Sequence, residues 1–296
     1  MSASRVISVA GCVALFVPLA LGVMGAGAQR GAGAQRGAGA QRGAGAQRGA
    51  GAQRGAGAQR GAGAADAGQA AQPVGLIRNE AGAYPGYTLL SPLQSTSTFL
   101  IDMEGKVVKR WVTDSTPSSL AYFLENGDIV RSGMAADAPF GRTAGGGGKM
   151  QEFNWNGDLV WDYAFGTADV TQHHDFTRLP NGNILMVIKE RKTADEAIAA
   201  GRIASAVEGS VVQPDGLIEI RPVGKNGAEI VWQWRLWDHL IQDNDKDKSN
   251  YGDVAAHPER IDVNFLVTAG RRAQPDWTHF NAVAYNAELD QVAISL

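Results

Sequence analysis

A strand, a glycine turn and a second strand that ends in tryptophan recur three times between residues 99 and 234 of this sequence. The three copies are Phe99–Trp111, Phe153–Trp161 and Leu217–Trp234. Between them stand Asn126-Gly127 and Asn181-Gly182, dipeptides typical of tight turns that join antiparallel strands. Four short antiparallel strands in each repeated unit are the pattern of a β-propeller blade, so we expect an all-β fold.

The length of the patterned region limits how much of a propeller the chain can form. A β-sandwich would also have short strands and regular turns, but not the repeated spacing from glycine to tryptophan. The residues from 74 to 296 correspond to about three to four blades, fewer than most closed propellers contain. We therefore expect a partial β-propeller from the N-terminal portion of a longer protein. The Ala-rich segment from Thr193 to Val207 predicts one helical interruption.

The N-terminal quarter of the sequence contains nothing that could fill a core. Arg5 and the apolar run from Val6 to Met24 predict a secretory signal peptide over residues 1–28, with an uncleaved membrane anchor through residues 6–24 as the alternative. The hexapeptide Gly-Ala-Gly-Ala-Gln-Arg then repeats without change from Gly25 to Arg60. We expect a disordered low-complexity linker over residues 29–73, because such residues gain nothing by ordering. The protein would be exported, either to the periplasm or into the medium.

Composition excludes several functions. The chain has one cysteine, Cys12, which lies in the expected signal peptide, so thiol catalysis and disulfides are excluded from the exported part. Residues 1–65 hold seven arginines and no acidic residue, which leaves 20 basic and 30 acidic residues in the remainder. An acidic folded part argues against nucleic acid as a partner.

Two histidine motifs about a hundred residues apart carry most of the functional information. They are Gln172-His173-His174-Asp175-Phe176 and Asp276-Trp277-Thr278-His279-Phe280-Asn281. Imidazole can attack an electrophile or bind an anion near neutral pH, and two such motifs predict a shared pocket. In a regular strand His173 and His174 would point to opposite faces, so we expect only one of them in that pocket. The alternative is that these histidines are structural.

Metal sites and cofactors are not indicated. The sequence has no His-x-His pair, no helical His-x-x-x-His and no available cysteine, so we expect no metal and no cofactor. The acidic segment Asp243–Asp253 lacks the glycine and the final glutamate of a calcium loop. Gly145–Gly148 precedes a strand and not a helix, which predicts a flexible loop and not a phosphate-binding loop. Asp238-His239 and His257-Pro258 read as structural.

From about Tyr87 to Leu296 the chain resembles the arylsulfotransferase family of bacterial envelopes. The matching segments are Thr98–Trp111, His173–Asn183, Ile230–His239 and Asp276–Tyr285. The resemblance implies a six-bladed propeller and transfer of a sulfuryl group from a phenolic sulfate ester to another phenol. In the family one histidine attacks sulfur to give a sulfohistidine, while two further histidines and an arginine hold the sulfate.

The resemblance also implies roles for particular residues. His279 corresponds to one sulfate-binding histidine, and His173 or His174 supplies the other, with His174 favoured because it precedes Asp175. Trp277, Asn281 and Asp175 are candidate substrate-binding residues. The family's arginine and nucleophilic histidine have no counterpart in the chain, so we expect this polypeptide to be inactive alone. The alternatives are a non-catalytic envelope propeller that binds a ligand, and a hydrolase that passes the sulfuryl group to water.

Overall fold

The computed structural model of this chain describes residues 6–9, 75–140, 145–265 and 274–296. The expected linker and all but four residues of the expected signal peptide lie outside these ranges. Those four residues form a short strand, β1 (Val6–Val9), which pairs in parallel with β18 (Gln291–Ser295). Among the described residues, no helix is long and apolar enough to cross a membrane.

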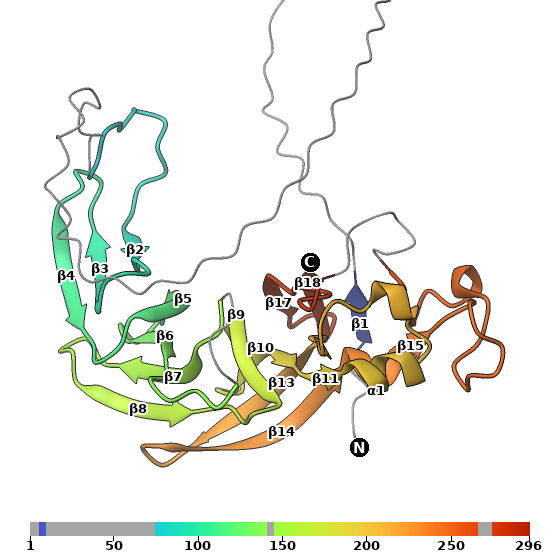
Figure 1. The fold of residues 1–296 in the computed structure, drawn as a ribbon. Helices are drawn as coiled ribbons and strands as arrows, with labels where there is room; N and C mark the ends of the chain where they lie inside the picture. The colour runs from blue at the N-terminus through green and yellow to red at the C-terminus, as the bar shows by residue number, and fades with distance from the viewer. Residues whose placement is uncertain (1–5, 10–74, 141–144, 266–273) are drawn as a thin grey trace, which may run out of the picture. The chain divides into compact units, whose positions relative to one another are not determined.

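The described chain is all-β, as the sequence predicted, and its antiparallel sheets follow one another in chain order without closing (Figure 1). The first sheet contains β2 (Thr88–Leu90), β3 (Ser97–Ile101) and β4 (Val107–Val112). The second contains β5 (Pro117–Phe123), β6 (Ile129–Met134), β7 (Gly148–Phe153) and β8 (Leu159–Ala164). The third contains β9 (Val170–Arg178), β10 (Ile184–Glu190), β13 (Asp215–Val223) and β14 (Gly227–Arg235). The fourth pairs β17 (Ala282–Asn286) with β18.

The repeated tryptophans join each sheet to the next. The indole N–H of Trp111, on β4, donates to the carbonyl of Asn154 in the second sheet over 2.9 Å. Trp161, on β8, makes the same bond to Gly227 in the third sheet, also over 2.9 Å. Both indoles are buried. A buried indole needs a partner for its N–H, and here a turn of the following sheet supplies it.

The hairpins β5–β6 and β9–β10 share one irregular pairing. In β5–β6, Ala121 pairs with Arg131, ten residues on, and the next pair is Pro117 with Gly133, sixteen residues apart. In β9–β10, Phe176 pairs with Met186 and the next pair is Gln172 with Ile188, with the same two spacings. Three residues therefore oppose one at the same place in each hairpin, namely Ser118–Leu120 in β5 and His173–Asp175 in β9. Such a bulge interrupts the alternation of side chains along a strand.

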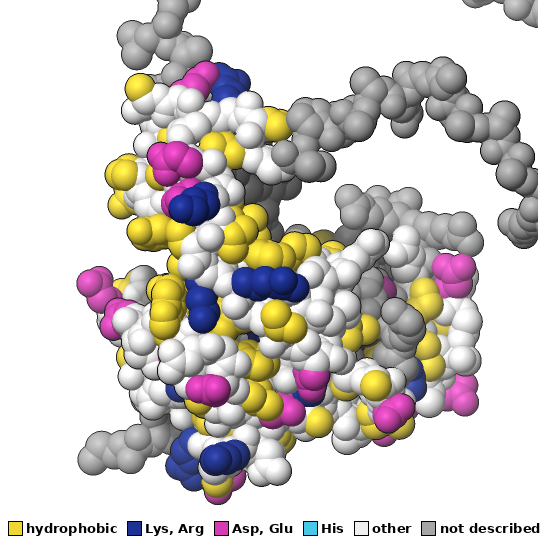
Figure 2. Space-filling model, turned by 90° about the vertical axis from the view of Figure 1, so that its left-hand side faces the viewer, with side chains coloured by type: hydrophobic (Ala, Val, Ile, Leu, Met, Phe, Trp, Pro, Cys, Tyr) yellow, Lys and Arg dark blue, Asp and Glu magenta, His cyan; other side chains and the backbone are white. Residues whose placement is uncertain are grey.

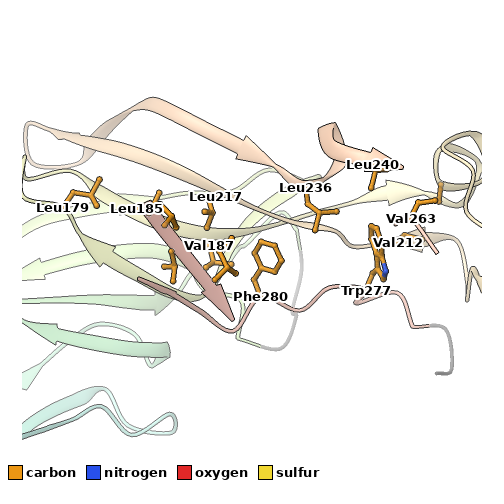
Figure 3. Packing of buried hydrophobic residues seen from close by; sticks show 14 residues of the cluster. Leu179, Leu185, Val187, Val212, Leu217, Leu236, Leu240, Val263, Trp277 and Phe280 are labelled. Atoms are coloured by element: carbon orange, nitrogen blue, oxygen red, sulfur yellow. The ribbon is translucent and has the colours of Figure 1, made fainter. Parts of the chain in front are cut away.

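Apolar side chains fill the spaces between consecutive sheets. β10 is buried along its whole length and contributes to both of its faces. Leu185 and Val187 pack toward Phe280, while Ile184, Met186 and Ile188 belong to the cluster with Val130 and Phe176. Figure 3 shows the first cluster, with Trp277 and Phe280 reaching it from outside the third sheet. The outer strands β4 and β8 expose scattered apolar residues such as Val108 and Val160. On the face that Figure 2 shows, hydrophobic side chains lie between charged ones.

The helical interruption is shorter than the sequence predicted. Only α1 (Ala194–Ala199) is α-helical, and a 3₁₀ turn, η1, follows at Ala204–Ala206. Thr193 caps the start of α1 in a reciprocal capping box with Glu196. Gly201 ends it with a φ of 90°, a conformation that glycine adopts without strain. The prediction of one helix to Val207 was therefore wrong, because it ignored this glycine.

Short strands and 3₁₀ turns flank α1 and follow β14. Two-residue strands pair on either side of α1, and two more pair after β14; they are β11 (Lys192–Thr193) with β12 (Val211–Val212), and β15 (Leu240–Ile241) with β16 (Ile261–Asp262). The 3₁₀ turns η2 (Leu236–His239) and η3 (Val254–Ala256) precede β15 and β16 respectively.

Candidate functional site

The bulge in β9 places the rings of His173 and His174 against each other. Their Nδ1 atoms lie 2.7 Å apart. His174 has a φ of 51°, the left-handed region that most residues avoid. The expectation that the two side chains point to opposite faces was wrong here, because it assumed a regular strand.

The second histidine motif lies beside the first. Gln213, just before β13, forms a bridge with Asp276, and its N–H donates to the carbonyl of Pro275 over 2.6 Å. His279 has the same φ of 51° as His174, and the centres of these two rings lie 4.7 Å apart. The ring of His173 lies 6.4 Å from that of His279. Three histidines that the sequence singled out therefore meet in one place.

Asp215 holds His173 from the side opposite His174. The Nε2 atom of His173 lies 2.6 Å from one carboxylate oxygen of Asp215, and both side chains are fully buried. The other oxygen accepts from the hydroxyl of Thr278 over 2.5 Å and from the backbone N–H of Phe280 over 3.0 Å. Asp215 thus ties the strand of His173 to the segment that carries His279.

His279 has a separate carboxylate partner. Its Nδ1 lies 2.7 Å from one oxygen of Asp276, and the ammonium group of Lys189 lies 2.6 Å from the other. Burial raises the pKa of Asp276, but the hydrogen bonds and charges of Lys189 and His279 outweigh it, so the pKa is lowered overall. Lys189 is fully buried on β10, and this carboxylate neutralises it.

His174 stands between the two pairs and is held in its neutral form. Burial, followed by the charges of His173, His279 and Lys189, lowers its pKa to about 4, while Asp276 opposes the shift. Near pH 7 its ring therefore carries one proton. Nδ1 of His174 faces His173 and Nδ1 of His279 faces Asp276. Within the part of the chain that the structure describes, Nε2 is therefore the nitrogen that each ring has left for a ligand.

Two neighbours of His174 were not identified from the sequence as part of the site. The N–H of His174 donates to the carbonyl of Gly145 over 2.8 Å, and Gly146 bridges to His173. A methyl group on Gly145, whose φ is 66°, would come within 2.5 Å of the His174 ring. Gly145 and Gly146 are therefore packed against the histidines, where the sequence predicted a flexible loop. The hydroxyl of Ser119 also donates to the carbonyl of His174.

The hydrogen-bond partners of the Asp175 carboxylate are not histidines. Its carboxylate accepts from the hydroxyl of Tyr122 over 2.7 Å and from the backbone N–H of Val283 over 2.9 Å. One buried side chain on β9 therefore joins β5 and β17. The resemblance implied that Asp175 is a candidate substrate-binding residue, but the carboxylates that contact the histidine rings are those of Asp215 and Asp276.

Trp277 and Asn281 also lie where their contacts are structural. The indole of Trp277 is 3% exposed, packs in the core and lies under the guanidinium of Arg202 at 4.9 Å. Its N–H donates to the carbonyl of Phe265 over 3.3 Å. Asn281 is exposed, and its backbone N–H donates to Ser295 in β18. Neither contact places the side chain against the three rings.

The remaining sequence candidates are separate from the site. His239 stacks on Trp234 at 5.0 Å, and His257 pairs with Glu259 at 2.9 Å on the surface. Within the ranges that the structure describes, no group of three or more His, Cys, Asp or Glu is arranged to hold a metal ion.

The geometry of the three histidines and their partners defines a class of site. Three imidazoles, two carboxylates and one buried ammonium group meet in an all-β protein, an arrangement suited to binding an anion or to transferring a group that carries negative charge. The sequence model of the arylsulfotransferase (ASST) family matches residues 76–296. The chain belongs to the arylsulfotransferase family.

Other comparisons add little. No curated protein matches the chain. Among solved structures, the chain is similar to a protein of unknown function from Bacteroides caccae, at 12% sequence identity and a TM-score of 0.35. That match covers 69% of this chain and 48% of the other, so the chain spans about half the length of its structural match.

Proposed function

We propose that His174 and His279 bind the sulfuryl group of an aryl sulfate, and that the protein takes part in its transfer to a phenol. The observation that carries this proposal is the approach of the two rings to 4.7 Å, with each Nδ1 already engaged. Two Nε2 atoms are then left for one ligand. The family match supports aryl sulfates and phenols as the substrates.

The chemistry of sulfuryl transfer matches what this site supplies. Like phosphoryl transfer, it spreads negative charge over three equatorial oxygens, so positioned donors and nearby positive charge lower the barrier. An imidazole whose Nε2 carries a proton serves as a donor, and Lys189 offsets the negative charge that Asp276 places beside His279. Because both rings are fixed by carboxylates or by another ring, little reorganisation is needed when the ester binds.

We propose that this chain carries only part of the family's catalytic set. The family's arginine and attacking histidine have no counterpart among the 296 residues, so we propose that a longer form makes the sulfohistidine. The 296-residue chain would bind an aryl sulfate without turning it over. We also propose that the protein is exported, as the apolar run before the hexapeptide repeat suggests.

The scaffold that we propose is a β-propeller. Two features support it: the indole bonds from Trp111 and Trp161 to the following sheet, and the identical bulges in the β5–β6 and β9–β10 hairpins. Both are properties of a repeated unit packed in series. A structure of a longer form would test the number of blades.

Binding and turnover are tested separately. Binding of 4-nitrophenyl sulfate to the 296-residue chain is measured by calorimetry, and release of nitrophenol with a phenol acceptor is measured for this chain and for a longer form. We expect binding by both, turnover only by the longer form, and loss of both properties in His279→Ala. His257→Ala, which removes a surface histidine paired with Glu259, is the matched control. Absence of binding in every form would refute the proposal.

One competing function has support of its own. The three histidines and the buried Lys189 would also suit a non-catalytic envelope protein that binds an anionic ligand at the same site. Under that interpretation both forms bind the ester and neither releases nitrophenol. If a longer form releases nitrophenol without any acceptor, the protein is instead a hydrolase.

A further inference from the structure

The carboxylate of Asp215 fixes where one proton of His173 lies. One of its oxygens accepts hydrogen bonds from the hydroxyl of Thr278 and from the backbone N–H of Phe280. The N–H of Asp215 itself points to the Thr278 hydroxyl, so that hydroxyl must use its single proton on the carboxylate. Nε2 of His173 lies 2.6 Å from the second oxygen and must carry a proton to bond to it.

The pair formed by His173 and His174 then has two possible protonation states. One proton must lie between their Nδ1 atoms, which are 2.7 Å apart. If His174 supplies it, His173 is neutral and Nε2 of His174 is a bare acceptor. If His173 supplies it, His173 is a cation held by Asp215, and Nε2 of His174 carries a proton and is a donor. The two states differ by one proton for the pair.

Only the second state can bind an oxyanion through His174, because a bare nitrogen repels a sulfate oxygen. The added proton would enter at Nε2 of His174, the less buried ring, while the proton on its Nδ1 moves across to Nδ1 of His173. His173 is fully buried, so this is the route by which it gains a proton. No other bond is made or broken.

The surroundings decide which ring holds the added charge. The charged and titratable groups that act on His174 from neighbouring segments are Lys189, Asp276 and His279. Asp215 contacts His173 directly, and Asp175 is occupied by Tyr122. The lowered pKa of His174 agrees with the charge residing on His173, next to the carboxylate.

We infer that Asp215 and His173 are positioning residues that hold one proton and thereby convert Nε2 of His174 from an acceptor into a donor, so that binding of an oxyanion takes up a proton. The inference deepens the proposed function and rests on it for the identity of the anion. It concerns two residues that make no contact with the ligand. Their effect is transmitted through the ring of His174.

The first experiment needs no ligand. The chain is labelled with ¹⁵N-histidine, its five histidines are assigned with single substitutions, and the nitrogen shifts are followed by NMR from about pH 8 to about pH 4. We expect His173 to gain a second N–H while His174 keeps one, which moves from Nδ1 to Nε2. A His173 that stays neutral over this range, or a His174 that becomes doubly protonated first, would overturn the inference.

The second experiment uses 4-nitrophenyl sulfate as the probe. Calorimetry near pH 7 in two buffers of different ionisation enthalpy gives the number of protons taken up on binding. Asp215→Asn and His173→Gln should each take up about one proton fewer than the wild type and bind about tenfold more weakly, the loss expected for one charge-assisted hydrogen bond. His257→Ala should match the wild type.

The outcomes separate the two proposals. In Asp215→Asn the single amide oxygen cannot accept from both His173 and the Thr278–Phe280 side, so His173→Gln and the wild-type NMR titration decide the question if that variant does not fold. Equal proton uptake by the wild type and His173→Gln overturns the inference and leaves the proposed function intact. If the wild type binds no ester, the proposed function fails, and the ligand-free titration still decides whether the proton moves as inferred.

Discussion

Ser119 and His174 occupy the same position in two successive hairpins, and the hydroxyl of Ser119 donates to the backbone carbonyl of His174. Each is the middle residue of a bulge in the first strand of its hairpin. Ser119, from the preceding sheet, therefore holds the backbone of His174, and His173, on the same strand, holds its ring.

We predict that Ser119→Ala weakens binding of 4-nitrophenyl sulfate by about three- to tenfold, because one hydrogen bond that positions His174 contributes about 1 kcal/mol. Ser249→Ala, at an exposed serine far along the chain, should leave binding unchanged. Calorimetric dissociation constants measure both. Equal affinities for the two variants would show that Ser119 has no influence on the site.

Gly145→Ala should displace the His174 ring. Its methyl group would lie within 2.5 Å of that ring, and the φ of 66° disfavours alanine, so we expect a loss of about 1–3 kcal/mol of folding stability together with weaker ester binding. Gly182→Ala is the matched control, since its φ is 83° but nothing lies within 4 Å of the added methyl. The control should lose stability only. Urea unfolding and calorimetry separate the two effects.

Asp276 should stabilise the folded protein because it pairs with the buried ammonium group of Lys189. Asp276→Asn leaves the ammonium group without its carboxylate, which should cost about 3 kcal/mol, the effect of breaking a buried ion pair. The double variant Lys189→Met with Asp276→Asn should regain most of that loss. Free energies of unfolding in urea complete the double-mutant cycle. Additive effects would mean that the two side chains do not interact.

The lowered pKa of His174 predicts how stability depends on pH. In the unfolded chain this imidazole takes up a proton near pH 6.5, but in the folded protein only near pH 4, so the unfolded state binds more protons between these values. Stability should therefore rise with pH from about 4 to about 6.5 and then level off, with a contribution of up to about 3 kcal/mol from this group.

His174→Asn isolates that contribution, because asparagine tolerates a positive φ and does not titrate. Urea midpoints of this variant should depend less on pH across the same window than those of the wild type. An unchanged dependence would assign the effect to other groups.

Much of the fold could be predicted from the sequence because its signals are local. Asn126-Gly127 and Asn181-Gly182 do join antiparallel strands, and the periodic tryptophans do lie on outer strands. The helix was overextended because composition was followed past Gly201. Local patterns thus identified the elements better than their ends.

The histidines of the site were found, but their partners were not. Asp215 follows Pro214 and precedes Gly216, which resembles a turn, and only the folded chain brings it to His173. Lys189 offered a signal that could have been used, since it is a charged residue that directly follows the apolar run Ile184–Ile188. The bulge that joins His173 to His174 depends on pairing with β10, which periodicity along a single strand does not reveal.

The carboxylate of Asp175 has a consequence for ligand size. It accepts from Tyr122 in the second sheet and from Val283 in the fourth while belonging to the third. One buried side chain, next to His174 on β9, therefore ties three consecutive sheets together. A bulkier ligand could not be admitted by spreading these sheets without leaving that carboxylate unsatisfied, so the width of the site is set before any ligand arrives.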